Sequence, residues 1–561
     1  VGLVALLAIV LAVPPPVGAK EGSFLIKTEN GDTFSFGAQL RMIPTSENDW
    51  DFGLGTRTIF GSEEVNAKRH VNESGEVAQG YIRTEARLYF TGEDKDKKWS
   101  LYSALEFDSV VDQTEVDQRG RDYGLERLHG SVAIPGLEQV RFHAGWDIYY
   151  MDAVDAGAGF IYGDDDPGFW LTGDFGTLEF QVGYHKKLDS NFASRDQAEY
   201  IDDQAGVKSD NDRDLYDAML TYHVNDDNEV RFMALYDVMK TRSDTTDTFA
   251  TGNPALPTFG TTNKGADVKT YRLGILYTGK LGIFEPEFEA VYQGGEANNA
   301  VDEFGQLPNG SDDDYDIKAY ALYADVALNL TDVFGFKVMP HVGFMYTSGD
   351  DDGDDDDLEG YTAVANAQRF TPRFGGEDTI IGDGNTLLGT ILYGYLPELY
   401  GSMGGSQSSG GVATGGLTNG SVGGRGDNPG MTMFGGGITI EPKEFISYRT
   451  NFMWFEVNED FAVNSTSPPN NPALPPGFDP NTKVDSGTLG QQWSNSLRIS
   501  LSKNVHIFGN ATFFWPDEVI EDVTKDVYGK KADDVAQRYA VALIWTFHNH
   551  CSCRLSGTVV K

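Results

Sequence analysis

The side chains best suited to chemistry crowd into one stretch near the end of the chain, HNHCSC, which holds His548, His550, Cys551 and Cys553. Imidazole nitrogens and thiolate sulfurs are the ligands that zinc prefers, so a metal site is the first possibility that they raise. Their spacing is too tight for a recognised zinc pattern, and the sequence holds no second half of such a pattern. We therefore predict no metal site, and we treat residues 548–561 as a solvated tail of unknown role.

Catalytic chemistry has no better support elsewhere in the sequence. The chain has 9 histidines, and none lies beside a serine or an aspartate in a nucleophile motif such as G-x-S-x-G. It has no C-x-x-C-H motif for haem attachment, and its 2 cysteines cannot build a disulfide framework. We predict that the protein is not an enzyme and that it carries no cofactor.

Carboxylates are the most abundant ionisable groups. Asp and Glu number 85 against 43 Lys and Arg, which gives a formal net charge of -42. A chain this acidic repels phosphate backbones, so we exclude nucleic acid as a partner. The densest cluster, SGDDDGDDDDLEG at 348–360, lacks the spaced oxygens and the terminal Glu of an EF-hand loop. Two interpretations stay open, a diffuse site for divalent cations and a solvated acidic loop.

The other charged residues alternate with apolar ones, and this pattern identifies the elements that must position them. In YIRTEARLYF, Arg83, Glu85 and Arg87 occupy one parity and apolar side chains occupy most of the other. A period of two predicts strands with one polar face and one apolar face. About nineteen such segments follow one another, joined alternately by short turns and by long acidic or glycine-rich connections.

The first residues depart from this pattern. VGLVALLAIVLAVPPPVGA is an apolar run followed by small residues, and the run is too short to span a bilayer comfortably as a helix. We expect residues 1–19 to be a secretory signal peptide, truncated at its start and cleaved after Ala19. No later apolar stretch in the sequence is long enough for a transmembrane helix.

An exported chain of two-faced strands can bury its apolar faces in two ways. Two stacked sheets can meet in a dry core, or one closed sheet can turn its apolar face to lipid. The regular alternation of short turns and long loops favours the closed sheet. We predict an all-β fold in which residues 20–547 form a transmembrane antiparallel β-barrel of about 18 strands, within about 16 to 20, with short periplasmic turns and long extracellular loops. The segment 23–27 and the last strand, 539–547, should share one composite strand, which keeps the strand number even.

The last strand carries the sharpest signal. Its alternating apolar residues end in Phe, and they resemble the terminal strand of Gram-negative outer-membrane porins: Tyr539, Val541, Leu543, Trp545 and Phe547. The resemblance implies an outer-membrane location, recognition of this strand by the barrel assembly machinery, contact with outer-membrane lipid and lipopolysaccharide, and a homotrimer. Aromatic residues at strand ends fit the interfacial girdles of such barrels: Tyr89, Phe90, Trp99, Trp454 and Trp545.

The inward parity of each strand gives the charges expected to line the pore. The basic ones are Arg41, Arg83, Arg87, Arg127, Arg141, Arg231, Arg272, Arg449, Arg498 and Arg538. The acidic ones are Glu85, Glu106, Asp108, Asp147, Glu179, Asp237, Glu285, Glu287 and Glu289. This set resembles the arrangement of general porins, in which a ladder of arginines faces carboxylates and orients polar solutes.

These features predict a water-filled channel for passive diffusion of small hydrophilic solutes and ions, with a weak preference for cations that comes from the acidic loops. A channel specific for an oligosaccharide or an organic acid, an outer-membrane enzyme, and a barrel sheath around a separate cytochrome stay open as alternatives. The acidic loops could also hold divalent cations that bridge lipopolysaccharide. Two connections could fold into the lumen, residues 348–430 and residues 143–160, and the second contains Asp147, Asp152 and Asp155.

Overall fold

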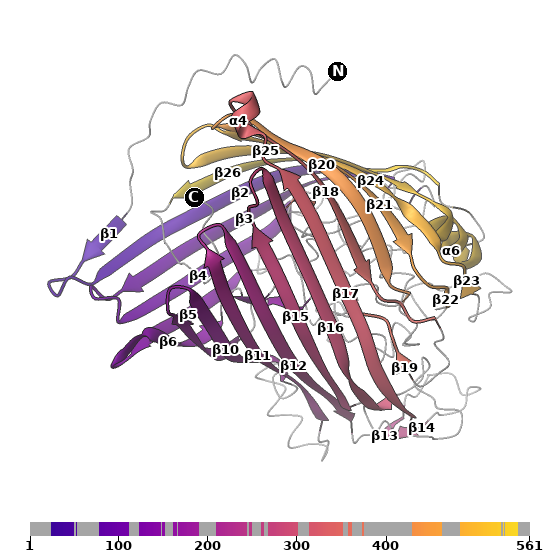
Figure 1. Ribbon diagram of the computed structural model, residues 1–561, viewed down its shortest axis with the longest axis horizontal. Helices are drawn as coiled ribbons and strands as arrows, with labels where there is room; N and C mark the ends of the chain where they lie inside the picture. Colours follow the sequence, from indigo (N-terminus) through magenta and orange to yellow (C-terminus); the bar gives the residue numbers. More distant parts are fainter. Residues whose placement is uncertain are drawn as a thin grey trace.

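One sheet of antiparallel strands closes into a barrel of 18 strands (Figure 1). The computed structural model describes residues 24–49, 52, 78–111, 123–146, 149–151, 161–164, 167–189, 209–243, 246–248, 260–262, 267–300, 313–351, 357–361, 373–374, 429–462, 483–528, 531 and 533–547. The predictions for 1–19 and 548–561 lie outside these residues. The strands of the ring, in order, are β2 (Thr33–Asn48), β3 (Ala78–Glu93), β4 (Trp99–Val111), β5 (Tyr123–Ile134), β6 (Leu137–Trp146), β9 (Pro167–Asp174), β10 (Leu178–Asp189), β11 (Ser209–Asn225), β12 (Asn228–Ser243), β15 (Asp267–Gly279), β16 (Phe284–Ala300), β17 (Asp313–Leu328), β18 (Lys337–Thr347), β20 (Met431–Lys443), β21 (Ile446–Val457), β24 (Gly487–Ser500), β25 (Val505–Pro516) and β26 (Ala536–Phe547). The predicted fold class is confirmed.

The ring closes between its last and first strands. β26 pairs with β2, and Phe547 lies opposite Ala38. β1 (Phe24–Lys27) pairs with β2 just beyond this point, where Phe24 lies opposite Phe36. Because β3 pairs along the other edge of β2, β1 must continue the line of β26. The predicted composite strand is confirmed, and it gives an antiparallel barrel its even number of places.

The two ends of the barrel differ in the length of their connections. At the end that carries α4 (Thr331–Phe334), neighbouring strands are joined by short turns, such as residues 94–98 (Figure 1). In that turn the backbone N–H groups of Lys98 and Asp96 donate to the Asp94 carboxylate and lower the pKa of Asp94. The opposite end carries the long connections, as the sequence predicts.

Large apolar side chains cover the outward face of the wall. On β12, Phe232 and Tyr236 are 50% and 42% exposed, whereas Met233 and Leu235, of the opposite parity, are 3% and 2% exposed. β26 follows the same rule and turns the residues of the predicted assembly signal outward: Tyr539, Val541, Leu543, Trp545 and Phe547.

One of the expected girdle residues faces the other way. Tyr89 lies opposite Gly37 on the inward parity, and its hydroxyl donates to the Gln39 side chain at 3.5 Å. Phe90, the next residue, takes the outward face and lies opposite Phe36. The alternation of side chains along the strand, and not nearness to the strand end, therefore determines which way Tyr89 points.

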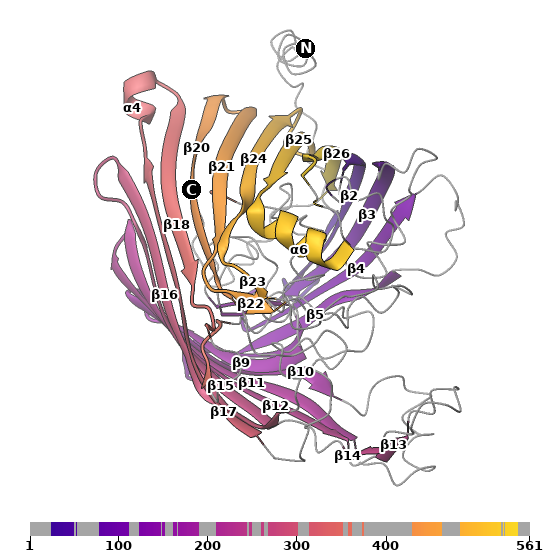
Figure 2. The same cartoon turned by 90° about the vertical axis from the view of Figure 1, so that its right-hand side faces the viewer.

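Short elements lie within the long connections. They are β7 (Tyr149–Tyr150) with β8 (Gly163–Asp164), β13 (Thr246–Thr248) with β14 (Gly260–Thr262), β22 (Phe461–Ala462) with β23 (Lys483–Val484), and β19 (Asp357–Leu358), which pairs in parallel with β17. α6 (Glu518–Tyr528) packs against β23, β24 and β25 with Val519 and Ile520 buried (Figure 2). Within the described part of the chain, no helix is both long enough and apolar enough to cross a bilayer.

Candidate functional site

The inward face of the barrel divides into two sectors that differ in charge and in cover. We call the inward faces of β21, β24, β25, β26, β2, β3 and β4 the arginine-rich sector. We call the inward faces of β11, β12, β15, β16 and β17 the covered sector. The order of the strands places the two sectors on opposite sides of the ring (Figure 2).

In the arginine-rich sector, alternating charges run across three strands. Arg41 and Glu85 lie opposite each other on β2 and β3, with Arg41 Nη1 3.4 Å from Glu85 Oε2. Arg87 Nε lies 3.1 Å from Glu85 Oε1 and donates to Glu106 Oε1 on β4 at 2.8 Å. The Arg87 and Glu106 side chains keep 22% and 19% of their surface exposed. The Arg87–Glu106 pair is therefore partly hydrated, which weakens it and leaves its charge accessible to a solute, whereas Glu85 is buried between the two arginines.

Further arginines make this sector positive. Arg449 on β21 and Arg538 on β26 lie on inward positions, and Arg538 is 8% exposed. Arg498 on β24 is exposed, and its guanidinium carbon lies 5.8 Å from the centroid of the Phe508 ring on β25. An arginine above an aromatic face keeps its charge and is held in place by the ring.

The covered sector holds a buried cluster of opposite charges. Arg213 Nε donates to Asp237 Oδ1 at 2.9 Å and Arg213 Nη2 donates to Asp237 Oδ2 at 2.7 Å. Arg272 Nη1 lies 3.5 Å from the same Oδ2 and donates to Thr270 Oγ1 at 2.9 Å. Arg272 is 2% exposed and Asp237 5%. The two-pronged geometry of Arg213 on Asp237 is what allows such charges to be buried.

Carboxylates outnumber arginines on the strands that follow. Glu287 and Glu289 on β16 and Asp325 on β17 are all buried on the inward face. Arg373, from the connection between β18 and β20, forms an ion pair with Asp325 and lies 3.9 Å from Glu287. One sector of the lumen wall is therefore positive, and the other carries most of the carboxylates.

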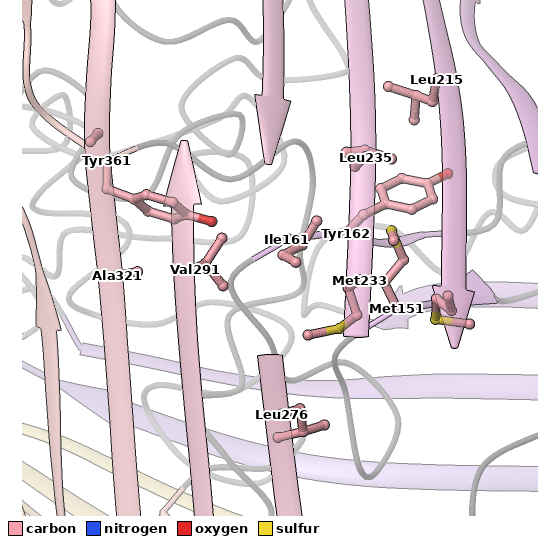
Figure 3. Close-up of a cluster of buried hydrophobic side chains, with 12 residues drawn as sticks. Met151, Ile161, Tyr162, Leu215, Met233, Leu235, Leu276, Val291, Ala321 and Tyr361 are labelled. Atoms are coloured by element: carbon pink, nitrogen blue, oxygen red, sulfur yellow. The ribbon is translucent and has the colours of Figure 1, made fainter. Parts of the chain in front are cut away.

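Apolar side chains also occupy the covered sector, and residues of two connections cover them (Figure 3). The strand residues are Leu215, Met219, Met233, Leu235, Leu276, Val291, Ala319 and Ala321. Met151, Ile161 and Tyr162 come from the connection between β6 and β9, and Tyr361 comes from the connection between β18 and β20. An apolar inner wall is stable when such cover removes its surface from water.

A hydrogen bond fixes one of these covering segments. Arg231 Nη1 on β12 donates to the backbone carbonyl of Met151 at 2.9 Å, and Arg231 is buried. The described part of residues 143–160 therefore includes a segment that reaches the inner wall. Asp147, Asp152 and Asp155, expected near the lumen, lie outside the described residues.

A stack of aromatic rings joins β5, β6, β9 and β10 between the two sectors. Trp170 lies between His129 and His185, with ring centroids 5.0 Å and 5.7 Å away, and is nearly parallel to His143, at 8° and 5.2 Å. His129 Nε2 lies 2.9 Å from His143 Nδ1, and His185 Nε2 lies 3.2 Å from Asp217 Oδ1. In the described part of the chain, no group of three or more His, Cys, Asp or Glu residues could hold a metal ion.

The expected pore residues differ in how much of each the structure describes. On inward positions with described side chains lie Arg41, Arg87, Arg127, Arg141, Arg231, Arg272, Arg449, Arg498, Arg538, Glu85, Glu106, Glu179, Asp237, Glu285, Glu287 and Glu289. The side chains of Arg83 and Asp108 are outside the description, and so is the whole of Asp147. Arg141 lies near the short turns, where its Nη1 donates to the Lys97 carbonyl at 2.7 Å.

The alternating pattern of the sequence does not predict three of the charged or titratable residues on the inward face. Arg213 lies one residue before the segment that the sequence marks as apolar and alternating, DLYDAMLTYHV, and β11 extends to Ser209. Asp325 and His341 lie on the inward parity of β17 and β18, within apolar runs that draw attention away from them. The run of glycines at 435–437 in β20 is the signal that could have revealed a close approach at this wall.

Acidic side chains gather where β18 and β21 reach the long connections. Burial, then Asp351, Asp460 and Glu359, raise the pKa of Glu459. Asp350 is only 2% exposed and its Oδ2 accepts a hydrogen bond from the Glu359 backbone N–H at 3.2 Å. The part of the mouth next to β18 and β21 is therefore electronegative.

No family model and no curated protein matches the chain. Among solved structures, OccK3 (OpdO) of Pseudomonas aeruginosa is 9% identical, with 91% of this chain and 95% of that chain covered and a TM-score of 0.43. The outer membrane protein opdK of the same organism is 8% identical, with 91% and 98% covered and a TM-score of 0.43. OmpT, an outer membrane protein of Vibrio cholerae, is 9% identical, with 93% and 99% covered and a TM-score of 0.36. Sequence identities and TM-scores this low do not establish a shared function.

Proposed function

We propose that this protein is an outer-membrane porin of a Gram-negative bacterium, a channel through which small hydrophilic solutes and ions diffuse passively. The observation that carries the proposal is the two-faced wall of a closed barrel, apolar outside and charged inside. We do not propose that the protein acts as an enzyme or binds a cofactor.

The outward face supports a membrane location on physical grounds. In hydrocarbon every backbone N–H and C=O must be paired, and a closed antiparallel ring pairs them without a free edge. Its exposed residues include Leu273, Phe232 and Val342, at 52%, 50% and 67% exposed, which would be unfavourable in water. Lipid is the environment in which this surface is stable.

The inward face supports a hydrated path. About sixteen to eighteen strands enclose an aqueous channel when side chains alone do not fill it. The inward segments at Met151, Tyr162 and Arg373 narrow that channel on the covered sector, and the arginine-rich sector faces them. Positive charge on one side and carboxylates on the other would orient a dipolar solute across the path.

A weak preference for cations is part of the proposal. The chain carries a formal net charge of -42, and acidic side chains gather at the mouth where β18 and β21 end. A negative entrance raises the local concentration of cations and lowers that of anions, although the arginines inside oppose it. The preference should therefore be modest and should shrink as salt screens the mouth.

The decisive experiment reconstitutes the full chain in planar bilayers. Ohmic steps of current in symmetric salt, together with a reversal potential displaced toward the cation in a salt gradient, would support the proposal. Absence of conductance from protein that shows the heat-dependent gel mobility of a folded barrel would refute it. A reversal potential displaced toward the anion would refute only the cation preference.

A substrate-specific channel is the second candidate, because the inward segments at Tyr162 and Phe374 give the lumen a definite shape. A saccharide or organic acid that blocks the ionic current at low concentration would favour it over general diffusion. An enzyme or a cytochrome sheath would instead show hydrolysis of phospholipid or peptide, or co-purifying haem.

The expected partners belong to the same proposal. They are outer-membrane lipid, lipopolysaccharide bridged by divalent cations at the acidic loops, the barrel assembly machinery acting on the β26 residues, and two further copies in a homotrimer. Cross-linking in native membranes tests the trimer, and truncation of Phe547 tests the assembly signal.

A further inference from the structure

Arg373 and Phe374 are held against the inward faces of β17, β18, β20 and β21. Phe374 has no exposed surface, and its ring meets the His341 ring edge to face at a centroid distance of 4.6 Å. A Cβ atom at Gly343 or at Gly435 would collide with the Phe374 ring. These two glycines therefore form a seat in the wall that any larger residue would fill.

Asn451 on β21 binds the backbone of the same two residues. Its Nδ2 donates to the carbonyl of Arg373 at 2.5 Å and to the carbonyl of Phe374 at 3.2 Å. Because both partners can only accept, the amide must point its nitrogen toward the segment and its oxygen toward His341. The orientation of Asn451 is thus fixed by the docked segment.

His341 on β18 lies between two acceptors. Its Nδ1 is 2.7 Å from Asp325 Oδ2, and its Nε2 is 3.0 Å from Asn451 Oδ1. An imidazole ring donates from both nitrogens only when it is doubly protonated and cationic. The other oxygen of Asp325 accepts a hydrogen bond from the Arg373 guanidinium, so Asp325 serves as an acceptor on both sides of this cluster.

We propose that His341 is a proton-operated latch, whose cationic form holds Arg373–Phe374 against the lumen wall and whose neutral form releases this segment and widens the channel. The inference rests on the proposed pore function. The latch should make the conducting path narrower in acid and wider in base.

Loss of the proton leaves no good arrangement for the docked state. A neutral ring that still donates to Asp325 sets its Nε2 lone pair against Asn451 Oδ1. If Asn451 turns over to avoid this, its oxygen meets the two carbonyls of the segment. Either contact replaces a charge-assisted hydrogen bond with an unfavourable pair of acceptors.

The surrounding charges are consistent with a cation at this position. Asp325 and Glu287 contribute two negative charges, and Arg373 supplies one positive charge. The other titratable side chains at adjoining inward positions of the described strands are Glu285 and Glu289 on β16, Tyr323 on β17 and Arg449 on β21. β20 presents only glycine at 435 and 437, so it contributes no charge.

The test records single-channel currents of the full chain between about pH 5 and about pH 8, the range in which histidine side chains ordinarily change charge. The wild type should occupy a lower conductance level at the acid end, and the ratio of low to high occupancy should fall about tenfold toward the basic end, as expected for one lost charge-assisted hydrogen bond. His341→Gln should stay at the high level throughout, because its amide cannot donate to two opposed acceptors.

Two further variants separate the latch from a general effect of acid. Phe374→Ala empties the seat without changing the barrel wall, and it should also remove the pH dependence. His223→Gln is the matched control, since His223 is an inward histidine on β11 that contacts Glu179 and Glu229 and not the segment. It should keep the wild-type response.

A pH-independent wild-type current would overturn the latch, as would a normal response in His341→Gln or Phe374→Ala, or its loss in His223→Gln. None of these results affects the pore proposal. Folded protein without any conductance would instead overturn the pore, and the latch with it.

Discussion

The covered sector and the arginine-rich sector begin from the same strand pattern and end in different environments. In the arginine-rich sector, Arg87 and Glu106 pair with 22% and 19% of their side chains exposed. In the covered sector, Arg213 and Asp237 pair with only 7% and 6% exposed. The strands alternate in the same way in both, so the difference comes from the connections that lie on the wall.

Two separate features of the barrel therefore set the environment of an inward or outward side chain. Parity decides whether a side chain points to lipid or to the lumen, because the period of a strand is two. The connections then decide whether an inward side chain meets water or protein. Leu235 is stable inside an otherwise charged lumen because Met151, Ile161 and Tyr162 belong to the same buried cluster.

The largest expected effect breaks a buried ion pair in the covered sector. Asp237→Asn leaves the Arg213 and Arg272 guanidinium groups buried without their shared carboxylate, so the free energy of unfolding should fall by about 3–5 kcal/mol. Urea unfolding in detergent micelles, followed by tryptophan fluorescence, measures this change.

The matched variant in the arginine-rich sector is Glu106→Gln. It removes one of the two carboxylates that contact Arg87, from a partly exposed pair, and the expected loss is at most about 1 kcal/mol because Glu85 still contacts the guanidinium. Equal losses in the two variants would mean that the connections do not shield the covered sector from water.

The next prediction compares the loss of stability when a leucine is truncated on the inward face and on the outward face of the barrel wall. Leu235→Ala removes an inward side chain that is 2% exposed and should cost about 3–5 kcal/mol, since a cavity adds to the lost transfer energy. Leu273→Ala, on the outward face of β15 and 52% exposed, should cost roughly 2 kcal/mol or less, because lipid can fill the space. Unfolding of both variants in the same lipid vesicles provides the comparison, and a larger loss at Leu273 would contradict it.

The alternation of Phe232 and Met233 illustrates what the sequence could predict. The period of two gives the strands, their parity, the closed barrel and the composite strand from both ends, because each follows from local pattern and from the need to pair every backbone group in lipid. It does not give the cover over Met233, because that depends on Ile161 and Tyr361, which lie far away along the chain.

The contacts of Phe374 illustrate what the sequence pattern could not predict. Gly343, Gly435 and Asn451 belong to three strands, and their common partner lies in a connection whose residues follow no period. Glycines in a strand do indicate a close approach, but they do not say which residue approaches. Contacts of this kind require the three-dimensional arrangement.

A smaller effect concerns the charge of the arginine-rich sector itself. Arg498→Gln removes an exposed inward cation, and it should raise the permeability ratio of cation to anion about twofold, the effect of one unit charge across several ångströms of water. Reversal potentials at low salt measure the ratio. Lys98→Gln, in a short turn with 67% of its side chain exposed, is the control and should leave the ratio unchanged. An unchanged ratio in Arg498→Gln would show that Arg498 does not face the conducting path.

The smallest effect tests whether crowding of acid at the mouth costs stability. Burial and the neighbouring carboxylates raise the pKa of Glu459, so the folded protein binds a proton there more readily than the unfolded chain does. Glu459 therefore destabilises the fold while it is ionised, and this penalty should fade as the pH drops through its raised pKa. Glu459→Gln should be more stable than the wild type at neutral pH by well under about 1 kcal/mol, because solvent screens the group, and should lose this advantage in acid. Unfolding at several pH values measures the difference, and Glu138→Gln, at the exposed start of β6, is the control at the other end of the barrel. An advantage that persists unchanged in acid would place its origin outside the titration of Glu459.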